Sequence, residues 1–162
     1  MAGREFSGYA YSLSDLYQNA SFIITPEDAP EDAVSTLEKL ALSLGFGKVV
    51  KTTPREHDEI IAYTSQLAHI VSSAYIKSPT LQKEVGFSAG SFKDLTRVAK
   101  LNEDMWTSLF IKNKEPLIFE IKEITERLSE YLISLENEDS DTMKELLKNG
   151  RILKEKSIEE NK

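Results

Sequence analysis

The chain has 162 residues, of which 40% are hydrophobic and 29% charged, and these values are typical of a globular protein rather than a disordered or fibrous one. Its 20 Lys and Arg residues are outnumbered by 27 Asp and Glu residues, which gives a formal charge of -7. Because an acidic chain without a basic cluster is repelled by a phosphate backbone, we expect no nucleic acid among its partners. A chain of this length fits one domain, or one domain with a fragment of another.

The sequence contains no cysteine, which excludes a disulfide framework, a thiolate metal site and a thiol nucleophile. The start of the chain, Met1-Ala2-Gly3-Arg4-Glu5, lacks the apolar run of a signal peptide. No stretch approaches ~18 uninterrupted apolar residues, the length that a membrane-spanning helix needs. We therefore expect a cytoplasmic protein that makes no contact with a membrane.

The first third of the chain alternates between strand-like and helix-like patterns. Two β-branched runs, at residues 22–25 and 49–53, flank a segment with helical spacing that begins at Thr25-Pro26 and stops at Gly45. Two strands joined by a helix form a right-handed parallel crossover. Since parallel sheets normally have more strands and cover on both faces, we expect this region to be the edge of something larger.

From Thr53 onward the patterns are helical. The sequence Thr53-Pro54-Arg55-Glu56 predicts a capped helix start with proline at the first helical position, and Ser78-Pro79 ends that long helix. A further helix is expected to begin at Asn102, whose side chain can cap it. The clearest periodicity is an apolar seam at alternating steps of four and three, formed by Leu117, Ile121, Ile124, Leu128, Tyr131 and Leu135. This seam needs a partner helix, from a second subunit or from the same chain.

The chain has two histidines, His57 and His69, on the expected long helix. They are separated by about 18 Å along the helix axis, so they cannot share a metal ion, and neither has an acidic residue at a ligand spacing. We expect no metal site. His57, beside Asp58, is interpreted as a structural or capping residue, and His69, between apolar neighbours, as a hydrogen-bonded core histidine.

A glycine-bearing loop that contains Gly90 precedes a segment rich in cations. Glycine lets a ligand approach the backbone, and the planar guanidinium of Arg97 matches a carboxylate. The alternative is a solvated helix face on which Arg97 pairs with Asp94. Trp106 lies on an expected helix, where a tryptophan most often packs in the core, and we interpret it in that way.

Three motifs follow one another along the chain. They are Met1-Ala2-Gly3-Arg4-Glu5-Phe6-Ser7-Gly8, His57-Asp58 with Ser65-Gln66-Leu67-Ala68-His69, and Phe92-Lys93-Asp94-Leu95-Thr96-Arg97-Val98-Ala99 with Met105-Trp106. Together they resemble the prephenate dehydrogenase family, whose first motif has a His-Pro pair before Met-Ala-Gly. Order and spacing agree across essentially the whole chain.

The resemblance implies an oxidoreductase of tyrosine biosynthesis that oxidatively decarboxylates prephenate to 4-hydroxyphenylpyruvate with NAD or NADP. In the family, the histidine of the His-Pro pair accepts a hydrogen bond from the substrate hydroxyl, and here it would precede the first residue. By the family's pattern, Arg97 binds a substrate carboxylate and His69 contacts the same anion. Gly90 would line the pocket, Glu5 would lie in a polar network at its mouth, and Trp106 would pack nearby.

The sequence departs from the family in two respects. Gln66 and Ala68 stand where histidine and proline are common, which is a tolerable variation. The glycine fingerprint that holds a dinucleotide is absent, so we expect no cofactor bound to this chain and no activity from the chain alone.

The sequence therefore predicts a mainly α protein. Residues 1–53 are expected to be a strand-helix-strand remnant of the dinucleotide-binding domain, and residues 54–162 a helical bundle that binds prephenate or arogenate and forms a homodimer. The alternatives are a stand-alone module that binds an aromatic keto acid and a purely structural helical dimerisation domain.

Overall fold

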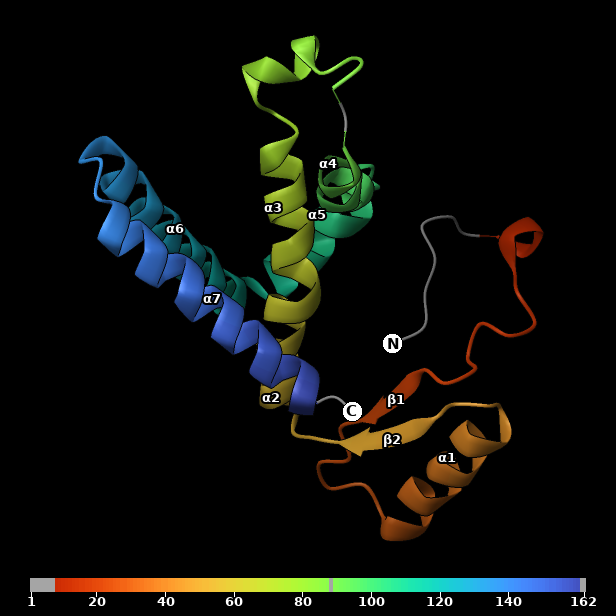
Figure 1. Ribbon diagram of the computed structural model, residues 1–162. Coiled ribbons are helices and arrows are strands. Elements are labelled where there is room, and N and C mark those ends of the chain that lie inside the picture. Colours follow the sequence, from red (N-terminus) through yellow and green to blue (C-terminus); the bar gives the residue numbers. More distant parts are fainter. Residues whose placement is uncertain (1–7, 88, 161–162) are drawn as a thin grey trace. The chain divides into compact units, whose positions relative to one another are not determined.

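The computed structural model describes residues 8–87 and 89–160 (Figure 1). The chain forms two compact units, Met1–Leu117 and Ile118–Lys162. Most described residues are helical, which confirms the predicted fold class. None of the described helices is long and apolar enough to cross a membrane.

A short 3-10 turn, η1 (Tyr9–Tyr11), precedes a strand-helix-strand element. The element consists of β1 (Ser21–Ile24), α1 (Glu31–Ser43) and β2 (Lys48–Lys51). The strands pair in parallel, as predicted, and Ser21 lies opposite Lys48.

The prediction that α1 begins at Thr25-Pro26 is wrong, because the helix starts at Glu31, after Pro30. The residue before a proline is disfavoured in the helical region, so Pro30 prevents the helix from extending further back. Buried side chains hold the element together: Ile24, Val34 and Ala41.

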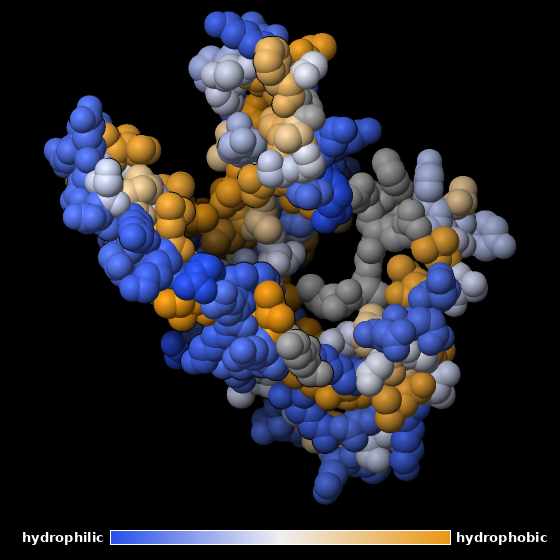
Figure 2. All heavy atoms as spheres, viewed as in Figure 1, coloured by the Kyte–Doolittle hydropathy of each residue, from blue (hydrophilic) through white to orange (hydrophobic). Residues whose placement is uncertain are grey.

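Part of the outer surface of this element is apolar. Leucines on and just after α1 have 44–56% of their surface exposed, namely Leu37, Leu40, Leu42 and Leu44. Figure 2 shows hydrophobic surface over this part of the chain.

One continuous helical stretch follows β2. It comprises α2 (Pro54–Ile61), the π-helical segment η2 (Ala62–Gln66) and α3 (Leu67–Tyr75). The predicted start is confirmed, since the Thr53 hydroxyl accepts a hydrogen bond from the Glu56 backbone N–H at 3.2 Å. The π segment was not predicted.

Short helices and α5 complete the first unit. They are η3 (Pro79–Lys83), α4 (Gly90–Thr96), η4 (Arg97–Ala99) and α5 (Glu103–Lys112). The prediction that Asn102 caps α5 is confirmed, because its side-chain oxygen accepts a hydrogen bond from the Met105 N–H at 2.9 Å. Both α4 and η4 pack against α3.

Helix α6 (Lys114–Glu136) runs from the first unit into the second, where it forms an antiparallel hairpin with α7 (Ser140–Glu160) (Figure 1). Asp139 caps α7 through its carboxylate, which accepts hydrogen bonds from the Thr142 N–H at 3.0 Å and from the Thr142 hydroxyl at 2.7 Å. These bonds stabilise the charged form and hold the pKa of Asp139 below its ordinary value. The Tyr131 hydroxyl reaches the Leu146 carbonyl oxygen across the hairpin at 3.5 Å.

The apolar seam of α6 is only partly covered in the single chain. Leu117 is 3% exposed, whereas Leu128 and Leu135 are 60% and 66% exposed. A helix of the same chain therefore satisfies only part of the seam. The rest remains open to a further partner.

Candidate functional site

His69 and Trp106 lie face to face. His69 is on α3 and Trp106 on α5, and their ring centroids are 3.7 Å apart with an angle of 29° between the planes. Phe110, one turn further along α5, lies 5.4 Å from Trp106 between ring centroids. The two helices thus bring an imidazole and an indole together from separate sequence motifs.

The hydrogen bond that His69 makes shows which of its ring nitrogens carries the hydrogen. Nδ1 lies 2.9 Å from the carbonyl oxygen of Ser65, and a carbonyl can only accept, so Nδ1 carries the hydrogen. In the neutral ring, Nε2 is then an acceptor, suited to a hydroxyl or N–H group. Only the imidazolium form can donate from Nε2 to a carboxylate.

A pocket of about 280 Å³ lies beside this ring pair. This volume is near the lower end of the ~300–1,000 Å³ found for small-molecule sites. His69, Ser73 and Lys77 line it from one side, and Glu103, Trp106 and Thr107 line it from the other. The lining offers aromatic surface, one cation, one carboxylate and two hydroxyls.

Sequence reasoning did not single out Ser73, Lys77 or Thr107. The signal was present, because Ser73 follows His69 at i+4 on one face of α3, and Lys77 lies another four residues on, in the turn after that helix. Using that signal required knowing that His69 faces a cavity.

The structure does not bring all predicted site residues together. Arg97 is exposed in η4, which packs against α3, but it is not part of the pocket lining. Gly90 is exposed at the start of α4, and no heavy atom of the described chain lies within 4 Å of the position that a Cβ would take there. Glu5 lies outside the described residues. The substrate-binding roles of these three residues stay predictions.

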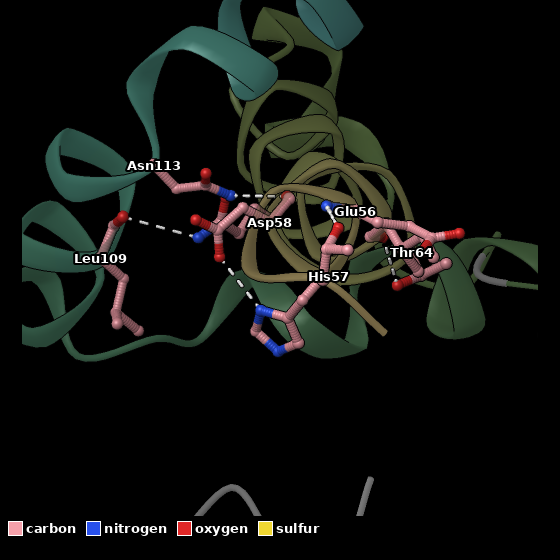
Figure 3. Close-up of polar contacts among 9 residues, drawn as sticks. Glu56, His57, Asp58, Thr64, Leu109 and Asn113 are labelled. Carbon is pink, nitrogen blue, oxygen red and sulfur yellow. Dashed lines mark hydrogen bonds and ion pairs between the residues drawn. The ribbon is translucent and has the colours of Figure 1, made fainter. Parts of the chain in front are cut away.

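His57 is separate from this pocket. Its Nδ1 lies 3.0 Å from a carboxylate oxygen of Asp58, and its side chain is 33% exposed (Figure 3). Within residues 8–87 and 89–160, no three His, Asp or Glu side chains come together as a metal site.

A buried polar cluster lies next to the π segment, and sequence reasoning missed it. Gln66 is only 5% exposed, and its side-chain oxygen accepts a hydrogen bond from Asn113 Nδ2 at 2.9 Å. The same Asn113 nitrogen donates to the carbonyl oxygen of Asp58, also at 2.9 Å (Figure 3). Asn113 immediately follows α5, so the cluster joins the end of α5 to the helix that carries His69.

A family model described as "Prephenate dehydrogenase, dimerization domain" matches residues 53–149. The chain belongs to the prephenate dehydrogenase family. The matched region includes His69, Arg97 and Trp106, and the resemblance found in the sequence is confirmed.

Curated relatives in this family are longer than the chain. It is 28% identical to the prephenate dehydrogenase of Bacillus subtilis (strain 168) over 149 residues, which cover 88% of this chain and 40% of that protein. It is 26% identical to the cyclohexadienyl dehydrogenase of Zymomonas mobilis over 162 residues, which cover 93% of this chain and 54% of that protein. The chain thus spans about half the length of the curated relatives it matches.

Solved prephenate dehydrogenase structures share this fold. The A. aeolicus enzyme, crystallised with hydroxyphenyl propionate and NAD+, matches with a TM-score of 0.81 and 29% identity over 96% of this chain and 56% of that one. Synechocystis arogenate dehydrogenase matches with a TM-score of 0.79 at 23% identity, over 96% of this chain and 59% of that one. The second likeness shows the fold alone.

The described residues do not fit the dinucleotide that the family uses. The connection from β1 to α1 contains no glycine, and the first turn of α1 carries Glu31 and Asp32. Two carboxylates at a helix N-terminus repel a pyrophosphate, which prefers bare backbone N–H groups. No catalytic step is therefore assigned to a cofactor on these residues.

Proposed function

We propose that this chain forms the substrate-binding and dimer-forming part of an oxidoreductase that converts prephenate to 4-hydroxyphenylpyruvate with NAD or NADP in tyrosine biosynthesis. The match of the dimerization-domain model to residues 53–149 carries this proposal, because that region contains the His69–Trp106 pair and its pocket. The chain alone is inactive in this account, and the protein acts in the cytoplasm.

The pocket supplies groups that suit a cyclic, anionic substrate. Trp106 and Phe110 offer apolar ring faces, and Lys77 offers a positive charge at the same pocket. His69 accepts from a hydroxyl when neutral and donates to a carboxylate when protonated. Arg97 is proposed as the carboxylate ligand on the family's pattern, with Gly90 and Glu5 in supporting positions.

The second unit supports self-association into a homodimer. Its hairpin leaves a row of large apolar side chains 54–68% exposed, namely Leu128, Leu132, Ile133, Leu135, Leu147 and Leu153. Figure 2 shows hydrophobic side chains among the charged surface of this hairpin. Large apolar side chains exposed in this number favour a protein–protein contact, and a two-fold pair of identical hairpins would cover them.

Binding of prephenate tests the proposal. Trp106 is the sole tryptophan, so its emission reports directly on the pocket. We expect a saturable change in emission as prephenate is added, and a loss of that change in Arg97→Ala. Arg55→Ala is the matched control, because Arg55 is an exposed arginine on α2 that pairs with Glu59.

Absence of saturable binding to the wild-type chain would contradict a substrate site and would favour a purely structural dimerisation domain. Binding that Arg97→Ala leaves unchanged would contradict the role of Arg97. Reduction of NAD or NADP by the chain with prephenate would contradict its expected inactivity. Binding without turnover is also what a stand-alone aromatic keto-acid module would show.

A further inference from the structure

The π segment η2, Ala62–Gln66, interrupts an otherwise α-helical stretch three residues before His69. The Leu67 N–H donates to the carbonyl oxygen of Ala62, five residues back instead of four. Such wide turns account for well under 1% of residues in globular proteins. Their presence therefore calls for a specific stabilising cause.

The π turn determines where His69 points. A π turn holds one more residue than an α turn, and each residue of a helix rotates by about 100° around the axis. If residues 62–66 were wound as ordinary α-helix, everything after them would turn by about 100° relative to α2. His69 would then leave the face on which Trp106 stacks.

Three side chains donate hydrogen bonds to backbone carbonyls around the π turn. Asn113 donates to the Asp58 carbonyl at 2.9 Å, the Thr64 hydroxyl to the Ile60 carbonyl at 2.7 Å, and His69 Nδ1 to the Ser65 carbonyl at 2.9 Å. The Thr64 and His69 bonds each span four residues, and the Asp58 carbonyl also accepts from the Ala62 N–H, so Asn113 adds a second donor there. The bonds of Asn113 therefore matter most, because they tie the turn to the end of another helix.

Asn113 is the donor that comes from outside the helix. Its side-chain nitrogen contacts both the Asp58 carbonyl and the buried oxygen of Gln66, which is the last residue of the π turn (Figure 3). Asn113 also ends α5, the helix that carries Trp106. One side chain thus links the turn that orients His69 to the helix that carries its stacking partner.

We propose that Asn113 and Gln66 are positioning residues, which hold the π turn so that His69 stacks on Trp106 with its hydrogen on Nδ1 and its acceptor at Nε2. Neither residue lines the pocket. The relevance of this positioning to prephenate rests on the proposed function, whereas the positioning itself does not.

Nuclear magnetic resonance of the histidine rings in the ligand-free 162-residue chain tests the proposal. In the wild-type chain, we expect the neutral His69 ring to carry its hydrogen on Nδ1 and its ring protons to be shifted upfield by the indole face. We expect Asn113→Leu and Gln66→Met to retain helical circular dichroism but to lose most of this upfield shift.

Asn137→Leu is the matched control. Asn137 also donates its side-chain N–H to a helix carbonyl, that of Ile133 at 3.0 Å, but it lies in the α6–α7 hairpin. His69 resonances that stay unchanged in folded Asn113→Leu and Gln66→Met would overturn the proposal. So would a neutral wild-type ring with its hydrogen on Nε2.

Deletion of Tyr63 provides a rescue that does not depend on the single variants folding. Tyr63 lies inside the π turn with 64% of its surface exposed, and its removal makes the Leu67-to-Ala62 bond an ordinary four-residue α-helical bond. The turn then no longer needs Asn113, so the deletion should restore the upfield shift of His69 in Asn113→Leu. Failure to restore it would overturn the proposal, while failure of prephenate binding would overturn only the proposed function.

Discussion

Replacement of Asn113 and Gln66, singly and together, measures how strongly the two side chains depend on each other. Asn113→Leu removes two hydrogen bonds of 2.9 Å and leaves the oxygen of Gln66 buried without its donor. An unsatisfied buried group costs about 1–3 kcal/mol and a lost neutral hydrogen bond about 1 kcal/mol. We therefore expect Asn113→Leu to lower the free energy of unfolding by about 2–3 kcal/mol.

Gln66→Met is expected to cost less. It removes the acceptor of one Asn113 hydrogen bond and a long 3.5 Å contact to the Leu109 carbonyl. Asn113 is half-buried, so it keeps its hydrogen bond to the Asp58 carbonyl and can also bond to water. We expect a loss of about 1 kcal/mol. In the double variant no buried amide is left unpaired, so its loss should be smaller than the sum of the single losses by about 1–2 kcal/mol.

Urea unfolding followed by Trp106 emission measures these free energies, with all four proteins at one concentration because self-association would add to stability. Single losses that add to within about 0.5 kcal/mol would refute the reasoning, since additivity means that the two side chains do not interact.

Three further predictions concern other parts of the chain. Leu117→Ala, at a side chain that is 3% exposed, should lower the free energy of unfolding by about 2–5 kcal/mol in a urea titration, and a smaller loss would show that its site is not a packed core. Asp139→Ala should lower the melting temperature of the chain near neutral pH, where the carboxylate is charged. Because the folded-state pKa of Asp139 is depressed, its contribution is complete above the ordinary value of 3.8 and is lost as the pH falls through the lowered value, so the difference between variant and wild type should disappear in acid. Sedimentation at micromolar concentration should give the mass of two copies of the chain. The double variant Leu147→Ser and Leu153→Ser should shift that mass toward one copy. A monomeric wild-type chain would contradict the homodimer.

Local sequence signals predicted much of the secondary structure. Thr53 and Asn102 cap the helices that follow them, because a capping side chain acts within three residues of its own position. The parallel pair of strands was also predicted, since a helix between two β-branched runs has few other solutions. The start of α1 was misplaced because Pro26 suggested a first helical position that Pro30 excludes.

The π turn could not be predicted from hydrophobic periodicity. Its cause is a contact between Gln66 and Asn113, which are 47 residues apart, and nothing in the local sequence predicts that contact. Several apolar side chains of the long helical stretch are not covered in the single chain, since Ile60, Tyr63 and Tyr75 are 48–64% exposed. Hydrophobic spacing identifies the apolar faces of a helix, but it does not show which of them the same chain covers.

The candidate site was predictable as a set of residues more than as a geometry. Family motifs singled out His69 and Trp106, which the structure places in contact. The same motifs singled out Arg97, which lies on η4 outside the pocket lining. A motif records residue types and spacing, but it does not show which residues line the same cavity.

The account depends above all on prephenate binding beside His69. The chain carries its own control for this, because His57 is the only other histidine and does not line the pocket. In a histidine spectrum recorded during a prephenate titration, the ring resonances of His69 should move and saturate while those of His57 stay in place. Resonances of His69 that do not respond, or of His57 that respond instead, would contradict a substrate site between α3 and α5.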